Sequence, residues 1–306
     1  MKVIHSAAEL VDRRKVCGAI GVFDGVHLGH QQIIRQTIAD ARQFEAASVV
    51  VTFDRHPNAI VAPGHVPPMI YSLPQKIRAI ESLGADTLLL IAFDKNFSEQ
   101  TGEAFIRGMA RDFGHLQSLC VGADFVFGHQ RGGNVALLRK LGDELHFTVH
   151  GMAAVALDGK AVSSTRIREA IREGNFDEAS QMLGRAYSLA GKVVRGDEVG
   201  RKLGFPTANL EFSGLVIPPT GVYAAHALVR GGRHRAVLNI GRRPTLEMPD
   251  PQLRVEVHLL NFQGDLYGED MEVEFVQKLR DEKKFASVEE LKTQISHDVA
   301  DALVSF

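Results

Sequence analysis

Short runs of hydrophobic residues alternate with amphipathic stretches from residue 16 to about residue 155. The hydrophobic runs predict strands at 16–23, 47–53, 86–93, 118–123 and 145–155. Between them, apolar residues spaced along one helical face predict helices at 31–43, 74–83, 102–113 and 134–141. This alternation of strand and helix predicts a doubly wound, Rossmann-like parallel sheet with helices on both faces.

The pattern changes after residue 187, where strands follow one another without intervening helices. They are predicted at 189–194, 221–229, 235–240, 253–260 and 271–276. The glycine-containing turns at 230–233 and 263–265 suit β-hairpins. Consecutive strands of this kind predict a small antiparallel β-barrel, with a last helix at 288–302 packed on its outside.

A domain boundary is predicted between these two patterns. Two consecutive helices are expected at 163–173 and 175–183, separated by Gly174 at a helix stop. Because 306 residues exceed the usual span of one compact domain, we expect two domains, 1–184 and 185–306.

The composition, 45% hydrophobic and 24% charged, is that of a globular protein. Basic residues number 35 and acidic residues 37, without long runs of either sign, which disfavours nucleic acid as a partner. Cys17 and Cys120 lie in apolar strands and are expected to be buried, reduced thiols. No segment resembles a secretory signal or is apolar enough to cross a bilayer, so a cytoplasmic protein is expected. The oligomeric state is not predicted.

A phosphate-binding site is predicted where the first strand gives way to the first helix. His27 and His30 stand at that helix start, and Gly29 lets a nucleotide base approach the backbone closely. Backbone N–H groups and the helix dipole favour phosphate there, and two imidazoles add donors suited to charge on an attacked α-phosphate. The alternative is a pair of incidental histidines on a surface helix.

A second phosphate-binding element is predicted at the start of helix 163–173. Ser164 and Thr165 can donate hydrogen bonds there, and Arg168 can neutralise a triphosphate. Judged alone, the hydroxyl residues are more simply an N-cap and the arginines a solvated face. Together with the histidines, this element predicts a clamp for ATP.

The landmarks of the first half resemble the nucleotidyltransferase module of the bacterial bifunctional riboflavin kinase/FAD synthetases. The family's glycine-x-phenylalanine-aspartate-glycine-x-histidine-x-glycine-histidine stretch is matched at 21–30, and further matches follow at 52–57, 122–133 and 163–168. The resemblance implies adenylyl transfer from ATP to FMN, giving FAD and pyrophosphate. It also implies that His27, His30 and Arg168 are catalytic.

The same resemblance implies which residues of this domain bind the substrates. For ATP they are Gly21, Phe23, Asp24, Gly29, Ser164 and Thr165. For the flavin they are His56, Pro57, Asp124, Phe125 and Arg131. Val22, Asp54 and Arg55 stand at positions that vary in the family, and no role is assigned to them.

A second site is predicted near the start of the strand-rich half. The glycine-rich loop at 196–204 suits closure over a nucleotide, although it lacks the residue order of a P-loop. Thr207 and Asn209 offer a hydroxyl and an amide oxygen to a hard cation such as Mg²⁺. Taken alone, the segment is more simply a glycine-rich loop and a polar turn before a strand.

Glu256 is a candidate general base for the same site. Strand alternation places it on one face with Arg254 and His258, opposite Val255 and Val257. A carboxylate near a metal-bound nucleotide can accept a hydroxyl proton during phosphoryl transfer. The alternative is that this face meets only solvent.

The second half resembles the riboflavin kinase module of the same family, at 203–209, 239–245, Glu256 and 279–285. The resemblance implies Mg²⁺-ATP contacts at Thr207 and Asn209, and Glu256 as the base at the terminal hydroxyl of riboflavin. It further implies ATP contacts at Gly196, Lys202 and Gly204, and flavin contacts at Arg280 and Phe285.

The sequence therefore predicts a transferase with two active sites, for the small-molecule substrates riboflavin, FMN and ATP. The barrel would phosphorylate riboflavin to FMN, and the α/β domain would convert FMN to FAD. Two alternatives stay open. One is a nucleotidyltransferase for another phosphate ester, with a rear domain that only binds ligand. The other is a flavin sensor or carrier without turnover.

Overall fold

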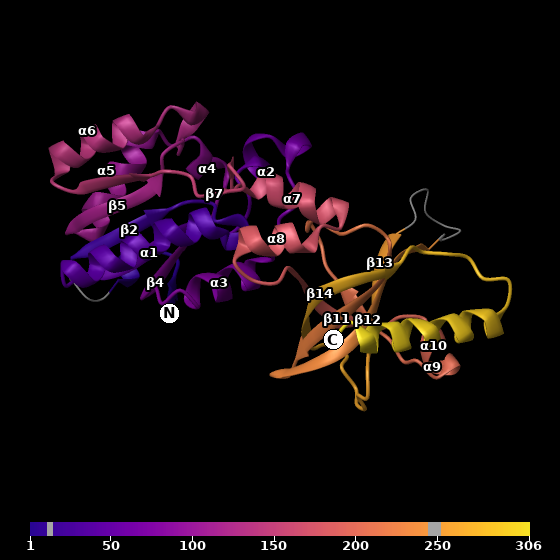
Figure 1. Cartoon of the computed structure of the whole chain (residues 1–306). Coiled ribbons are helices and arrows are strands. Elements are labelled where there is room, and N and C mark those ends of the chain that lie inside the picture. Colours follow the sequence, from indigo (N-terminus) through magenta and orange to yellow (C-terminus); the bar gives the residue numbers. More distant parts are fainter. Residues whose placement is uncertain (11–14, 244–251) are drawn as a thin grey trace. The chain divides into compact units, whose positions relative to one another are not determined.

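The computed structural model describes residues 1–10, 15–243 and 252–306, which form two compact units, Met1–Ser164 and Thr165–Phe306 (Figure 1). Helices α7 (Ser164–Glu173) and α8 (Phe176–Leu183) fall almost wholly in the second unit. Phe176 of α8 stacks on Phe275, which joins these helices to the core of that unit. The functional boundary at 184/185 stays a prediction.

A six-stranded, wholly parallel sheet forms the first unit, in the order β1-β4-β3-β2-β5-β6. Its strands are β1 (Lys2–Ile4), β2 (Val16–Ile20), β3 (Ala47–Phe53), β4 (Thr87–Ile91), β5 (Leu116–Gly122) and β6 (Thr148–Met152). The predicted doubly wound sheet is confirmed, with β1 as an additional edge strand. Because the strand order reverses between β2 and β5, a ligand crevice is expected at the carboxyl ends of these two strands.

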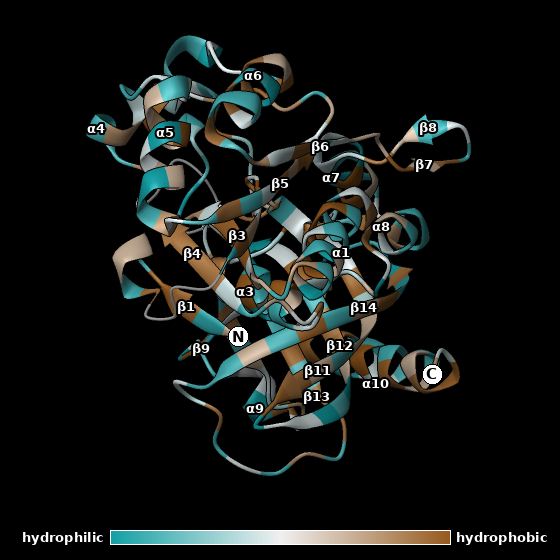
Figure 2. Ribbon diagram, turned by 90° about the vertical axis from the view of Figure 1, so that its left-hand side faces the viewer, coloured by the Kyte–Doolittle hydropathy of each residue, from teal (hydrophilic) through white to brown (hydrophobic). Residues whose placement is uncertain are grey.

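Helices cover both faces of this sheet (Figure 1). On one face lie α1 (Leu28–Gln43) and α3 (Leu73–Glu81), and on the other α5 (Gly102–Phe113) and α6 (Val135–Leu145). In β3, Val50 packs toward α1 and α3, whereas Val49 and Val51 pack toward α5 and α6. Figure 2 shows the resulting concentration of hydrophobic residues on the central strands.

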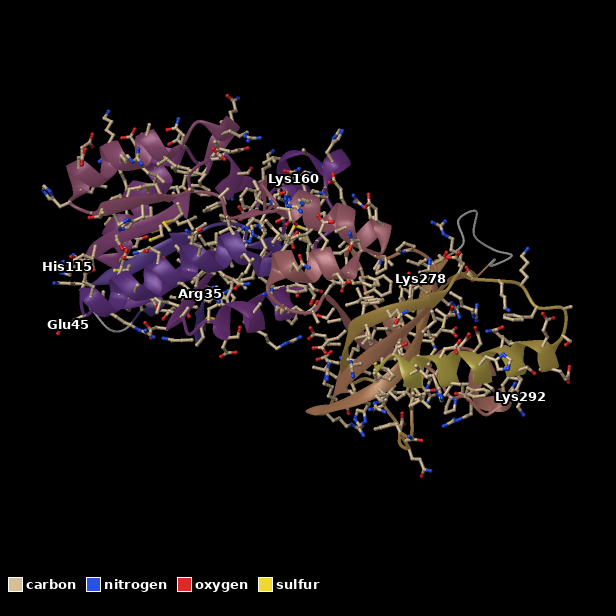
Figure 3. The ribbon with its side chains drawn as sticks, viewed as in Figure 1. Arg35, Glu45, His115, Lys160, Lys278 and Lys292 are labelled. Carbon is tan, nitrogen blue, oxygen red and sulfur yellow. The ribbon has the colours of Figure 1, made fainter. Side chains whose placement is uncertain are left out.

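Short elements complete the first unit and surround its ligand-facing edge. They are α2 (Asn58–Val61), α4 (Lys95–Ser98), the 3₁₀ turns η1 (Ala7–Glu9), η2 (Asp24–Val26), η3 (Pro63–His65) and η4 (His129–Arg131), and the paired strands β7 (Ala156–Leu157) and β8 (Lys160–Ala161). Exposed charged side chains of both signs, such as Arg35 and Glu45, stand on the surface (Figure 3).

A closed, antiparallel barrel forms the second unit, in the order β10-β13-β12-β11-β14-β9. Its strands are β9 (Ser188–Val194), β10 (Ala208–Glu211), β11 (Gly221–Val229), β12 (Gly232–Arg243), β13 (Gln252–Leu259) and β14 (Asp270–Arg280). The helix α9 (Val199–Leu203) precedes β10, and α10 (Val288–Val304) packs against β11, β12 and β14. Both the predicted barrel and its final helix are confirmed.

Of the two predicted hairpins, the one at 230–233 is confirmed and the prediction at 263–265 is wrong. Arg230 and Gly231, with φ of 52° and 74°, do form a tight turn between the paired strands β11 and β12. The turn at 263–265, by contrast, joins strands that are not neighbours. Both edges of β13 are occupied by β12 and β10, so the chain must cross to β11 and β9 before β14 can pair.

Gly128 provides a test of how the loop after β5 is packed. Its φ is +75°, and an added Cβ would lie 2.3 Å from the backbone nitrogen of Gly102. We expect Gly128→Ala to lower the free energy of unfolding by about 1–3 kcal/mol, because strain and overlap add. Gly64→Ala is the matched control, since its φ is not positive and no atom lies within 4 Å of the added Cβ. Equal denaturation midpoints for the two variants would contradict this packing.

Candidate active sites

His27 and His30 lie together at the start of α1, directly after β2 and η2. Their rings stack with centroids 3.6 Å apart. Phe23, in a left-handed conformation with φ of 51°, packs edge-on against His30 at 5.2 Å. The Phe23 ring also fills the space beside Gly21, where an added Cβ would lie 2.8 Å from it. The sequence from Gly21 to His30 therefore folds into one compact turn with the imidazoles at its end.

The surroundings of His30 set the charge of its ring. Burial holds the pKa of His30 well below its ordinary value, and the neighbouring His27 and Lys76 lower it further. The His30 ring is therefore neutral at neutral pH. Its Nδ1 is buried and has no hydrogen-bond partner among the residues that the structure describes. A buried ring nitrogen in this state is suited to a ligand atom, and the helix N-terminus favours phosphate.

The neighbouring predicted residues have different surroundings. The buried Asp24 uses Oδ1 to accept the backbone N–H groups of Ile70 (2.9 Å) and Tyr71 (3.4 Å), so its carboxylate holds a loop in place. Ser164, the first residue of α7, donates from Oγ to the carbonyl of Asp24 at 3.1 Å. Thr165, which is exposed, and Arg168, which is buried, follow in the same helix.

A cavity of about 990 Å³ lies at the carboxyl edge of the parallel sheet. Four of the five residues predicted to bind flavin in this unit line it: His56, Pro57, Phe125 and Arg131. Asp124 does not line it, although the next residue does. The wall also contains five aromatic side chains for which no role was predicted: Phe53, Phe93, Phe97, Phe105 and Phe127.

The aromatic side chains give this cavity walls suited to a flat ligand. Phe53 and Phe93 meet edge to face at 5.3 Å, and Phe125 stacks on Phe127 at 5.2 Å with only 13° between the rings. Offset and edge-to-face rings present both faces and edges to a planar heterocycle. A signal for them was available, because Phe53 and Phe93 stand at the carboxyl ends of predicted neighbouring strands.

The variable positions have structural roles. Val22 lines the aromatic cavity, and its carbonyl accepts a hydrogen bond from Thr52 Oγ1 at 3.1 Å. Asp54 accepts the backbone N–H of Phe93 at 2.9 Å and pairs with Arg55 at 2.8 Å. These contacts tie the ends of β2, β3 and β4 together beneath the cavity.

In the barrel, strand register aligns the candidate kinase residues. Glu256 of β13 is directly opposite Asn209 of β10 on one side and Asn239 of β12 on the other. Directly opposed residues of antiparallel strands have Cβ atoms about 4.5–5.5 Å apart and point to the same face. Val255 and Val257 are buried on the opposite face, as the alternation of this strand predicts.

The glycine-rich loop closes on the candidate metal ligands. A Cβ added at Gly196 would lie 2.1 Å from Asn209 Nδ2, and one at Gly200 would lie 3.2 Å from Thr207 Oγ1. Only glycine allows the loop to approach these two side chains so closely. The loop and the start of β10 therefore form one polar wall.

Three adjoining cavities meet at this wall. The first, which we call the polar cavity, has a volume of about 250 Å³ and is lined by Asn209, Glu256 and Arg254 among others. The second, the helix-side cavity, has a volume of about 280 Å³ and is lined in part by residues of α10. The third, the tyrosine-side cavity, has a volume of about 390 Å³ and is lined in part by Tyr267. Thr207 lines all three, and Glu256 lines the polar and helix-side cavities. Glu256 thus stands where two cavities join. Gly196, Lys202 and Gly204 do not line them.

Arg280 and Phe285 line the helix-side cavity. Nε and Nη2 of Arg280 donate to the two carboxylate oxygens of the buried Asp298 at 2.7 Å, and Nη1 donates to the carbonyl of Asp281 at 2.9 Å. The Cζ atom of Arg280 lies 5.8 Å from the Phe285 ring centroid. The ion pair with Asp298 holds Arg280 beside the aromatic ring, and the flavin contact of Arg280 stays a prediction. Of the stretch 239–245, Pro244 and Thr245 lie outside the described residues.

Arg254 and His258, on the same face as Glu256, are both engaged. Arg254 forms an ion pair with Asp197 of the glycine-rich loop at 2.7 Å. His258 Nδ1 lies 2.8 Å from the carbonyl of Pro206, and because a carbonyl can only accept, this nitrogen carries the proton. Asn239 and Glu282 also line the polar cavity. No role was predicted for these two residues. Asn239 reaches the cavity through the register of β12 with β13, and Glu282 reaches it through the loop after β14, and neither is evident in the sequence pattern.

Comparisons with known proteins give matches to both halves of the chain. The family profile of FAD synthetase matches residues 10–166, and that of riboflavin kinase matches residues 183–306. Bifunctional riboflavin kinase/FMN adenylyltransferases are similar over most of their length. The protein of Pseudomonas fluorescens is 38% identical over 99% of this chain and 97% of its own, and that of Escherichia coli K12 is 38% identical over 91% and 89%.

The chain belongs to the bifunctional riboflavin kinase/FMN adenylyltransferase family. Both predicted transferase activities are thereby confirmed, and so are the small-molecule substrates riboflavin, FMN and ATP. A crystal structure described as a macrolide-efflux protein from Streptococcus pneumoniae is also similar, with a TM-score of 0.85, 29% identity and coverage of 98% and 97% of the two chains. Within the described part of this chain, no helix has the length and apolar character needed to span a membrane.

Gly196 tests the close approach of the loop to Asn209. We expect Gly196→Ala to lower kcat/KM for FMN formation by about 100-fold, because the added methyl group displaces the Asn209 amide by an ångström or more. Gly214→Ala is the control: its φ of +65° makes it strained, yet no atom lies within 4 Å of the added Cβ. It should lose stability and keep its activity. Equal activities of the two variants would refute the assigned contact.

Proposed function

We propose that the two reactions of this family take place at the two sites described above. The adenylyltransferase domain would comprise residues 1–184 and the riboflavin kinase domain residues 185–306. The observation that carries the kinase assignment is the position of Glu256 at the junction of two cavities. For adenylyl transfer, the support is the stacked histidine pair at a helix start, on the same sheet edge as an aromatic cavity.

In adenylyl transfer, a phosphate oxygen of FMN attacks the α-phosphorus of ATP, and the bond to pyrophosphate breaks. The aromatic cavity holds the isoalloxazine ring of FMN between side chains such as Phe125 and Phe127. His27 and His30, with the backbone at the start of α1, donate to the phosphate oxygens on which charge grows. By family likeness, Ser164, Thr165 and Arg168 bind the leaving pyrophosphate.

In riboflavin phosphorylation, the terminal hydroxyl of the ribityl chain attacks the γ-phosphorus of ATP, and ADP leaves. Riboflavin lies in the helix-side cavity against Phe285, and the phosphates of ATP lie in the polar cavity. Glu256, which lines both cavities, accepts the hydroxyl proton. Asn209 and Asn239, opposite Glu256 in register, orient the reacting groups.

The residues of the polar cavity fit Mg²⁺ as the companion of ATP. Thr207 and Asn209 supply the hydroxyl and amide oxygens that a hard cation prefers. Within the described residues, no group of three or more His, Cys, Asp or Glu forms a metal cage, and Mg²⁺ characteristically keeps waters and phosphate oxygens instead. When bound, Mg²⁺ would neutralise charge on the transferring phosphate. A cytoplasmic location fits an enzyme that consumes ATP twice.

A direct assay tests the proposed activities. The pure chain is incubated with riboflavin, ATP and Mg²⁺, and FMN and FAD are separated by chromatography. We expect both products, with no turnover after chelation of Mg²⁺. A sensor or carrier would bind flavin without consuming ATP. Formation of FMN without FAD would leave only the barrel assignment standing.

Two substitutions test the division of labour between the sites. His30→Ala should lower FAD formation from supplied FMN by about 10²–10³-fold and leave FMN formation intact, because it removes a donor to developing charge. Glu256→Gln should lower FMN formation by about 10²–10⁴-fold and leave FAD formation from supplied FMN intact, because the general base is lost. Initial rates with each substrate supplied separately provide the measurement.

The two variants control each other, since each retains the reaction of the other site. Thermal unfolding of both should match the unsubstituted chain within a few degrees. Loss of both reactions in a folded variant would contradict the assignment of separate sites.

A further inference from the structure

Lys76 of α3 is a buried lysine next to the first site that has no role in the reaction described so far. Only 2% of its surface is exposed. Its ammonium donates to the carbonyl of Phe53 at 2.7 Å, and lies 3.4 Å from both the carbonyl of Val22 and Thr52 Oγ1. The acceptors come from the carboxyl ends of β2 and β3. The ammonium therefore fixes the two strand ends from which the histidine turn and the cavity wall continue.

The charge of Lys76 is not cancelled by a direct partner. Its three hydrogen-bond acceptors are neutral, and in the described chain it forms no ion pair. A fully buried lysine is normally paired, because desolvating an unpaired charge is costly. Burial lowers the pKa of Lys76 to about 8, while the more distant carboxylates of Asp24 and Asp54 act in the opposite direction.

The groups that face Lys76 come from each element packed around it. Asp24 belongs to η2, Asp54 follows β3, and His30 stands in α1, where the charge of Lys76 helps to lower the His30 pKa. Both carboxylates are engaged elsewhere, Asp24 with the backbone of Ile70 and Asp54 with Arg55. Neither carboxylate contacts the ammonium directly, so Lys76 stands behind the histidine pair with only neutral hydrogen-bond acceptors around it.

We propose that Lys76 is a positioning residue of adenylyl transfer. The negative charge of the ATP polyphosphate, bound at the histidine turn, compensates the buried positive charge of Lys76. The inference rests on the proposed location of the phosphate site at His27 and His30. Lys76 acts in two ways. It holds Val22 and Phe53, which line the aromatic cavity, at a fixed spacing, and it attracts the triphosphate through the backbone without touching it.

The charge of Lys76 gives the reaction a dependence on pH. The ammonium is fully charged well below pH 8 and loses its proton as the pH rises through about 8. We expect kcat/KM for ATP, measured as FAD formation from FMN, to be level near neutral pH. Above about pH 8 it should fall up to tenfold per pH unit, because that parameter reports groups of the free enzyme.

Variants of Lys76 separate charge from packing. Lys76→Met keeps the length of the side chain without its charge. It should lower kcat/KM for ATP by about 10–100-fold at neutral pH and abolish the alkaline fall. Lys76→Arg keeps the charge at all accessible pH values. It should retain more activity than the methionine variant and also lack the alkaline fall. Lys140→Met, at an exposed lysine of α6, should behave as the unsubstituted chain.

FMN formation by the barrel, measured in the same samples, reports the integrity of each variant. A methionine variant that keeps the alkaline fall at reduced activity would overturn the proposal and leave a purely structural role. If Lys76→Met does not fold, the comparison of Lys76→Arg with the unsubstituted chain decides, since an unshifted alkaline limb also overturns it. An unsubstituted chain that makes FAD without an alkaline fall contradicts this inference alone, whereas one that makes no FAD contradicts the proposed function.

Discussion

Closure of the barrel by β10 is the constraint on which the kinase site depends. This strand has only four residues, yet it pairs with both β13 and β9. The pairing sets Asn209 opposite Glu256 and places Thr207, the residue before the strand, at the wall shared by three cavities. A slip of one residue would turn Glu256 toward the core. The glycine-rich loop can then pack on these side chains because Gly196 and Gly200 have none.

The first unit also brings its site residues together, but it does so by a different geometry. In a parallel sheet, every carboxyl end reaches the same edge, so residues distant in sequence converge there without cross-strand register. Val22, Phe53 and Phe93 stand at or just after the carboxyl ends of three different strands, and all three line one cavity. The hydrogen bonds of Lys76, Thr52 and Asp54 join these strand ends. Edge convergence therefore assembles the aromatic cavity, and buried polar contacts set its spacing.

The sequence predicted the regular elements well, because their hydrophobic periodicity is strong. It missed β1 and β10, which are too short to show a period, and it predicted a false hairpin at 263–265 because a turn says nothing about which strand edges are occupied. His27, Glu256 and Asn209 could be found from local pattern and family likeness. Lys76 could not, since a lysine in an amphipathic helix is ordinarily a surface residue, and only the packing of α3 buries it.

The two sites differ in charge because their acceptors differ. Riboflavin offers a neutral hydroxyl that must lose a proton, so a carboxylate at Glu256 is useful beside the phosphates of ATP. FMN already carries an anionic phosphate and requires no base, so a free carboxylate would only repel it. Consistent with this, the carboxylate of Asp24 accepts hydrogen bonds from the backbone N–H groups of Ile70 and Tyr71, which belong to a neighbouring loop. The neutral imidazole of His30 and the buried ammonium of Lys76 stand behind the expected phosphates instead. The chemistry of each acceptor thus accounts for the sign of the charge that each fold presents.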